Sequence, residues 1–216
     1  MQIVIRLLLC LASLASLAAF AATACAQGPI ASPSASVVDT AKDSEWPSPD
    51  GEFAFLTSYG EDLHTIDLID RKSGKKLQRI GEEGSSQTYW HVLWAPDSKR
   101  FALMTRLGHP AQIVDFYFRN ADTFRKIELD LPAASIPEKL KHDKKFHGKK
   151  FPHYANINWK EASEWKNDGS LVVTIDTMID GEGASITATR TVVLRFDRAG
   201  KARIVKSTIR YETETD

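Results

Sequence analysis

Trp94-Ala95-Pro96-Asp97-Ser98 is a tryptophan followed by a turn, and an apolar strand, Phe101-Ala102-Leu103-Met104, comes soon after it. The same order recurs in two other places, as Trp46-Pro47-Ser48-Pro49-Asp50-Gly51 before Phe53–Leu56 and as Trp165-Lys166-Asn167-Asp168-Gly169 before Leu171–Ile175. Proline suits the second position of a type I turn, and Asp, Asn, Ser and Gly suit the others. Three copies of one pattern predict a repeated structural unit in which Asp50, Asp97 and Asp168 shape the turns.

Further strands are predicted around each apolar run, because alternating apolar residues indicate a half-buried strand. The second strands of the three units are expected at Ile66 to Leu68, Val114 to Phe118 and Val192 to Phe196. The returning third strands are expected at Leu77–Ile80, Phe124–Leu129 and Arg203–Ser207, and first strands at Thr88–Leu93 and Tyr154–Trp159. The sequence therefore predicts an all-β fold made of antiparallel meanders with four strands, or nearly four, in each.

This pattern resembles the WD40-like Pro-Asp repeats of TolB-type β-propellers, in which an apolar residue, Ser-Pro-Asp-Gly and a Phe-Ala-Phe strand open each blade. The resemblance covers residues 46–80 and 90–129 well and 159–206 less well. It implies a β-propeller-like architecture that serves protein contacts in the bacterial envelope. A closed propeller typically needs about four or more blades, and three are legible here. A β-sandwich built from the same meanders is the alternative.

The first 26 residues read as a secretory signal peptide, with Arg6 before an apolar core at Leu7–Phe20 and small residues up to Ala26. Residues 27–45 read as a linker rich in Ala, Ser and Pro, in which Ser36-Val37-Val38 is a candidate edge strand. No later stretch is long and apolar enough for a transmembrane segment in the mature chain. We expect export to the periplasm or cell envelope.

Cys25 allows two interpretations of the cleavage site. Ala24-Cys25-Ala26 fits ordinary cleavage before Gln27, which gives a soluble product. Ala22-Thr23-Ala24-Cys25 instead resembles a bacterial lipobox, in which Cys25 becomes lipidated and supplies a membrane anchor. The other cysteine, Cys10, also precedes the folded part, so packing rather than a disulfide must stabilise the domain.

Residues 46–216 are expected to form a single repeat-built domain that carries a basic insertion at 130–153. The full chain has 28 basic and 28 acidic side chains. A neutral balance creates no global field that would favour nucleic acid as a partner.

Motifs for catalysis and cofactor binding are missing from the sequence. It has no Gly-x-Ser-x-Gly elbow, no phosphate-binding glycine loop and no metal-ligand spacing among its six histidines. Asp180-Gly181 is read as a hairpin turn rather than as part of a calcium loop. We predict no catalytic residue, no metal and no cofactor.

Two places are candidate binding surfaces. The insertion gathers lysines, with Lys144 and Lys145 at its centre, after Pro137, which is expected to start a short helix in which Leu140 and Phe146 make the apolar contacts. A solvated loop is the favoured alternative. Trp90 and His91 form the second candidate, and core packing is the favoured alternative for this aromatic stretch.

Three functional hypotheses follow. The leading one is a non-enzymatic envelope module that binds a protein or glycan partner through loops at one end of its meanders. The second is a hydrolase or lyase whose catalytic residues come from different repeats. The third is a structural envelope protein anchored through a lipid on Cys25.

Overall fold

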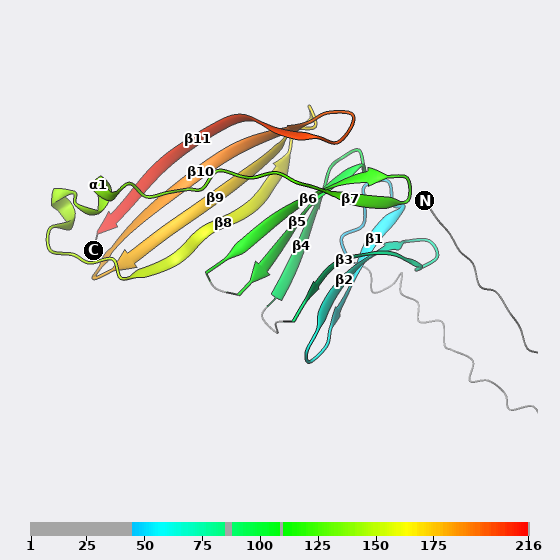
Figure 1. Ribbon diagram of the computed structural model, residues 1–216, viewed down its shortest axis with the longest axis horizontal. Coiled ribbons are helices and arrows are strands. Elements are labelled where there is room, and N and C mark those ends of the chain that lie inside the picture. Colours follow the sequence, from blue (N-terminus) through cyan, green and yellow to red (C-terminus); the bar gives the residue numbers. More distant parts are fainter. Residues whose placement is uncertain (1–44, 85–87, 109, 216) are drawn as a thin grey trace, which may run out of the picture. The chain divides into compact units, whose positions relative to one another are not determined.

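The computed structural model describes residues 45–84, 88–108 and 110–215, and in them the chain forms three antiparallel sheets (Figure 1). The first meander consists of β1 (Phe53–Tyr59), β2 (His64–Asp70) and β3 (Lys76–Glu83). The second consists of β4 (Thr88–Trp94), β5 (Arg100–Leu107), β6 (Gln112–Asn120) and β7 (Thr123–Ile127). The third consists of β8 (His153–Trp165), β9 (Leu171–Gly181), β10 (Ala184–Phe196) and β11 (Ala202–Thr215). The predicted all-β class and the predicted meanders are confirmed.

The three predicted turns adopt the expected geometry. Each closes with a backbone hydrogen bond: Gly51 N to Ser48 O at 2.9 Å, Ser98 N to Ala95 O at 3.0 Å, and Gly169 N to Lys166 O at 2.8 Å. The closing residue has a positive φ in every copy, +74° at Gly51, +55° at Ser98 and +74° at Gly169. Glycine adopts this conformation without strain, which explains why it closes two of the three turns.

The second meander packs against the first on one face and against the third on the other. Phe101 and Leu103 of β5 lie in a cluster with Phe55 of the first meander, whereas Met104 lies in a cluster with Ile175 of the third. Successive side chains of a strand point to opposite faces, so β5 is covered on both sides. Its continuous apolar run is therefore that of a strand buried on both faces, and β5 lies between β4 and β6 in its sheet.

The first meander has three strands, and a single bridge adds one further residue at the edge formed by β1. Glu45 forms a bridge with Phe55, with N to O distances of 2.7 and 2.9 Å.

The signal peptide, Cys25, almost all of the predicted linker, and Ser36-Val37-Val38 lie outside the described residues. None of the three sheets closes into a barrel.

The third sheet is built from the longest strands, and the basic insertion packs on it. Pro137 precedes α1 (Glu138–Lys141), as predicted, and a 3-10 turn follows at Lys144–Phe146. Phe146 is 2% exposed and packs with Ile179 and Ile186, and Leu140 packs on the same cluster. The insertion is therefore anchored by its apolar residues, while most of its lysines remain exposed.

Candidate functional site

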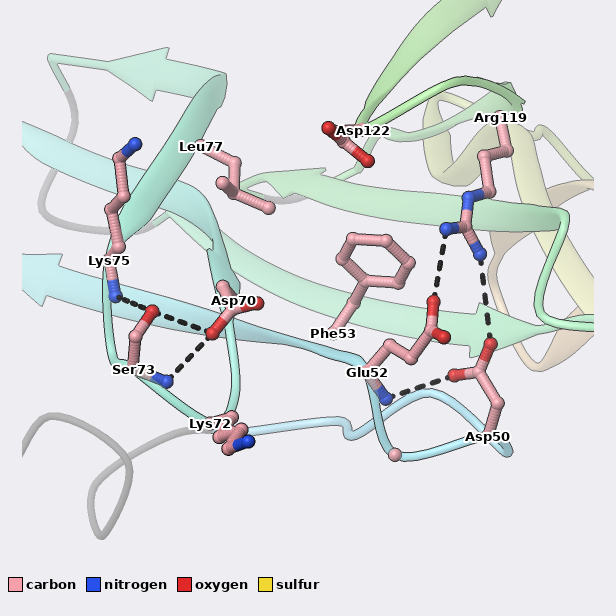
Figure 2. Close-up of a pocket in the computed structure, with 11 residues that line it drawn as sticks. Asp50, Glu52, Phe53, Asp70, Lys72, Ser73, Lys75, Leu77, Arg119 and Asp122 are labelled. Carbon is pink, nitrogen blue, oxygen red and sulfur yellow. Dashed lines mark hydrogen bonds and ion pairs between the residues drawn. The ribbon is translucent and has the colours of Figure 1, made fainter.

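A cleft of about 510 Å³ lies between the first and second meanders, at the end where their turns gather (Figure 2). Its walls come from the turn before β1, the β2–β3 hairpin and the β6–β7 turn. Phe53 and Leu77 supply apolar surface between these walls. Lys72 and Lys75 lie on the hairpin side, and Asp122 lies on the opposite side.

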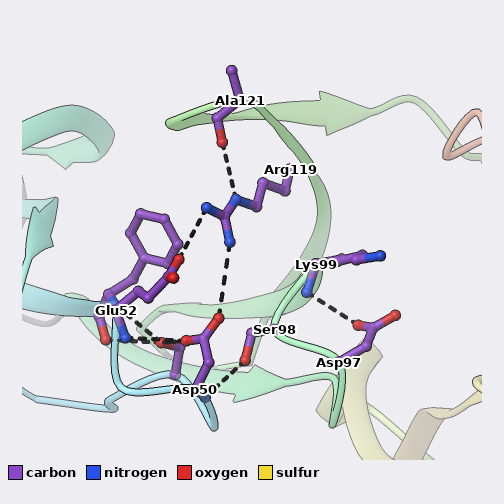
Figure 3. Close-up of polar contacts among 9 residues, drawn as sticks. Asp50, Glu52, Asp97, Ser98, Lys99, Arg119 and Ala121 are labelled. Atoms are coloured by element: carbon purple, nitrogen blue, oxygen red, sulfur yellow. Dashed lines mark hydrogen bonds and ion pairs between the residues drawn. The ribbon is translucent and has the colours of Figure 1, made fainter.

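Arg119 closes one side of the cleft, and its positive charge is neutralised by carboxylates of the turn before β1. Its guanidinium lies 3.0 Å from a Glu52 oxygen and 3.8 Å from an Asp50 oxygen, and its Nε donates to Ala121 O at 2.9 Å (Figure 3). The guanidinium carbon also stands 4.6 Å from the centre of the Phe53 ring. These contacts join β6 to the turn before β1, so Arg119 positions the wall of the cleft.

Asp50 serves the turn geometry that the sequence predicts. It accepts hydrogen bonds from Ser48 Oγ at 2.6 Å and from Glu52 N at 3.1 Å, and its own N–H donates to Ser98 Oγ at 3.0 Å. Burial alone raises the pKa of Asp50, but its hydrogen bonds with Ser48, Glu52 and Ser98 and the charge of Arg119 outweigh it, so that the pKa is lowered. The carboxyl is therefore held in its ionised form.

The other two turn carboxylates are bound in the same manner. Asp97 accepts a hydrogen bond from Lys99 N at 3.0 Å, and Asp168 accepts from Ser170 Oγ at 2.6 Å and from Ser170 N at 3.0 Å. The Ser170 hydroxyl is the main cause of the lowered pKa of Asp168. Arg100 also donates to Gly169 O at 3.2 Å, which ties the second turn to the third.

The candidate residues of β4 point in opposite directions. Trp90 is 6% exposed and lies in the cluster between the first two meanders, so it belongs to the core, the alternative that the sequence favoured. His91 is exposed and makes an edge contact with the Trp46 ring at 6.1 Å.

The candidate lysines of the insertion lie on the third meander, apart from β4. Lys144 and Lys145 are both exposed. Lys145 donates to the Thr213 hydroxyl and stands 5.2 Å from the centre of the Phe146 ring. The structure does not bring these lysines together with Trp90 and His91.

The predicted hairpin is confirmed, but its turn lies two residues later than predicted. Asp180 and Gly181 are the last residues of β9 and pair with Ser185 and Ala184 of β10, and the turn is formed by Glu182 and Gly183. Within the described ranges no group of three His, Cys, Asp or Glu side chains is placed to hold a metal ion. In the same ranges no helix combines the length and the apolar character that crossing a membrane requires.

The cleft itself was missed by the sequence analysis, although a signal for it was present. A turn before one strand and the turn after the next strand of an antiparallel meander lie at the same end of the sheet. Asp70–Lys75 and the turn at Asp50 are related in this manner, and both are rich in charged residues. Their shared position was predictable, whereas the approach of Arg119 from another meander was not.

Comparisons with known proteins identify no family. No protein-family profile and no curated protein sequence matches the chain. One similar solved structure is the uncharacterized protein lmo1340 from Listeria monocytogenes EGD-e, at 10% identity and a TM-score of 0.30. The match covers 76% of this chain and 51% of that one, so the chain spans about half of that protein's length.

Proposed function

We propose that this chain is an exported, non-enzymatic module of the cell envelope that binds a protein partner in the cleft between its first and second meanders. The observation that carries the proposal is the contrast between the cations of the cleft. Arg119 is neutralised by Asp50 and Glu52. Lys72 and Lys75 form no ion pair with any carboxylate in the described part of the chain, and both are exposed.

A partner segment that presents carboxylates toward Lys72 and Lys75, with apolar residues beside them, fits the hairpin wall of the cleft. Lys72 and Lys75 attract carboxylates, and the surface of Phe53 and Leu77 offers apolar contact between the charged walls. Protein interfaces commonly combine an apolar centre with a polar rim. Among the partners considered, this mixture favours a protein over a glycan.

The titratable groups of the cleft support binding rather than acid–base catalysis. A general acid in a hydrolase or lyase is usually a carboxyl whose pKa is raised. The pKa of Asp50 is lowered, and hydrogen bonds from the Ser73 side chain and backbone lower the pKa of Asp70. Both carboxylates remain ionised and occupied by hydrogen bonds within their turns.

The location and architecture in this proposal rest on the sequence. The signal peptide at residues 1–26 supports export, and Cys25 supplies a lipid anchor if the lipobox interpretation holds. The three turn-and-strand repeats support an incomplete, propeller-like arrangement of the TolB type, in which the turns at one end present the binding surface.

The experiment is capture of partners by chemical cross-linking in intact envelopes, followed by identification of the captured proteins. One variant carries Lys72→Glu and Lys75→Glu, and its matched control carries Lys166→Glu and Lys201→Glu, which lie in turns of the third meander. We expect the cleft variant to lose a partner that the wild type and the control both capture, and added salt to weaken the capture. Equal capture by both variants, or no specific partner for the wild type, would refute the proposal.

A further inference from the structure

Two strand edges that face a neighbouring meander receive hydrogen bonds from that neighbour. At β7 the Gln78 amide of β3 makes two bonds to Phe124: Nε2 donates to the carbonyl oxygen and Oε1 accepts from the N–H, both at 2.8 Å. At β8 the Gln112 side chain donates to Lys160 O at 2.8 Å, and Ile157 N donates to the carbonyl oxygen of Pro110 at 3.2 Å.

The outer edge of β11 has no such partner among the described residues. β11 is the last strand of the third sheet and pairs with β10 alone (Figure 1). It is 14 residues long. Its pairing with β10 shifts register at one place, between Ile204 and Lys206, so this pairing is continuous over residues 206–215. By contrast, the register of β8, the other edge of this sheet, shifts at three places.

Large apolar side chains are exposed along the same strand. Ile204 is 37% exposed, Val205 is 42% exposed and Tyr211 is 39% exposed. A long edge strand with unpaired N–H and C=O groups is a template for pairing with another chain, and burial of these side chains would add to such pairing.

The charges of β11 are arranged so that the strand complements itself. Its cations, Arg203, Lys206 and Arg210, all precede its anions, Glu212 and Glu214. When two copies run antiparallel, the basic half of one strand faces the acidic half of the other.

We propose that β11 pairs with β11 of a second copy about a two-fold axis that passes beside Ile209. In this register Lys206 of each copy lies opposite Glu212 of the other, so the attractive contact is made twice. A shift of two residues in one direction sets Arg210 against itself, and a shift in the other sets Arg210 against Lys206. Like charges directly opposite each other are unfavourable, so the charge pattern disfavours both of these neighbouring registers. Pairing through Lys206 and Glu212 joins the two sheets into a continuous antiparallel sheet.

The test uses sedimentation of the full chain over a range of concentrations, with Lys206→Glu, Glu212→Lys and the combined exchange. We expect a wild-type dimer, a dissociation constant raised about tenfold by either single change, and recovery in the double variant. Lys206 and Glu212 are exposed in the single chain, so all three variants should keep the wild-type melting temperature at concentrations where the wild type is monomeric. Lys166→Glu is the control and should dimerise like the wild type.

Hydrogen exchange supplies an independent measurement. Outward-facing amides of β11 should exchange slowly at concentrations where the dimer forms and rapidly where it dissociates, while amides of β9 stay unchanged. A wild type that is monomeric at every concentration would overturn the proposal. A double variant that fails to recover would overturn the Lys206–Glu212 register. Neither result bears on the cleft, which lies between the other two meanders.

Discussion

The indole Nε1 of Trp94 donates a hydrogen bond of 2.8 Å to the carbonyl oxygen of Trp46. Both are the opening tryptophans of their repeats. The third copy behaves similarly, since Trp165 Nε1 donates to Leu93 O at 3.1 Å. Each later tryptophan therefore ties its own sheet to the backbone of the preceding one, which gives a physical reason for its place in the repeat.

Replacement of Trp94 separates its packing from its hydrogen bond. Its ring contacts Phe53, Phe55, Phe101 and Phe124 at centroid distances of 5.0 to 6.5 Å. Trp94→Ala should lower the free energy of unfolding by about 3–5 kcal/mol. Trp94→Phe keeps an aromatic ring but leaves the carbonyl of Trp46 without its donor, so a loss of about 1 kcal/mol or more is expected. Urea unfolding measures both, and an unchanged midpoint in the alanine variant would contradict a core role.

Gln78 provides a second test of how the meanders are joined. Gln78→Leu should leave the N–H and C=O of buried Phe124 without these partners, at a cost of about 1–3 kcal/mol. Gln78→Glu keeps the acceptor but replaces the donor with an oxygen that faces the Phe124 carbonyl, so this variant should also be less stable than the wild type. Thermal unfolding should place both variants below the wild type. A leucine variant as stable as the wild type would show that the joint contributes nothing.

Local patterns in the sequence predict the strands and turns because their determinants lie within a few residues of one another. Proline, aspartate and glycine specify each turn, and alternation specifies each strand. The same alternation places Trp90 in the core, since its neighbours Tyr89 and His91 are exposed. Contacts between meanders, such as Arg119 with Asp50, depend on how the sheets pack and leave no local signature. The approach of Arg119 to the cleft was for this reason beyond prediction, whereas the apolar contacts of Leu140 and Phe146 were predicted and are confirmed.

Acidification should reveal the contribution of Asp50. Its pKa lies below the ordinary value of 3.8 in the folded chain. Its ionised form therefore stabilises the fold above that value, and the stabilisation is lost as the pH falls through the lowered pKa. The difference in unfolding free energy between wild type and Asp50→Asn should shrink between about pH 5 and pH 2.

A difference between the wild type and Asp50→Asn that stays constant from about pH 5 to about pH 2 would contradict this expectation. It would mean that the hydrogen bonds and the charge around Asp50 do not favour its ionised form.

The insertion should depend on Phe146 for its attachment and not on Lys144. Phe146 is 2% exposed and packs on Ile179 and Ile186 of the third sheet, with the Phe151 ring 5.3 Å away. Phe146→Ala should lower the free energy of unfolding by about 3 kcal/mol, whereas Lys144→Ser, a change at an exposed position, should alter it by less than about 0.5 kcal/mol. Limited proteolysis reports the local effect, because release of the insertion exposes the bonds that follow its lysines. If Phe146→Ala left cleavage unchanged, the cluster with Ile179 and Ile186 would not be what holds the insertion on the sheet.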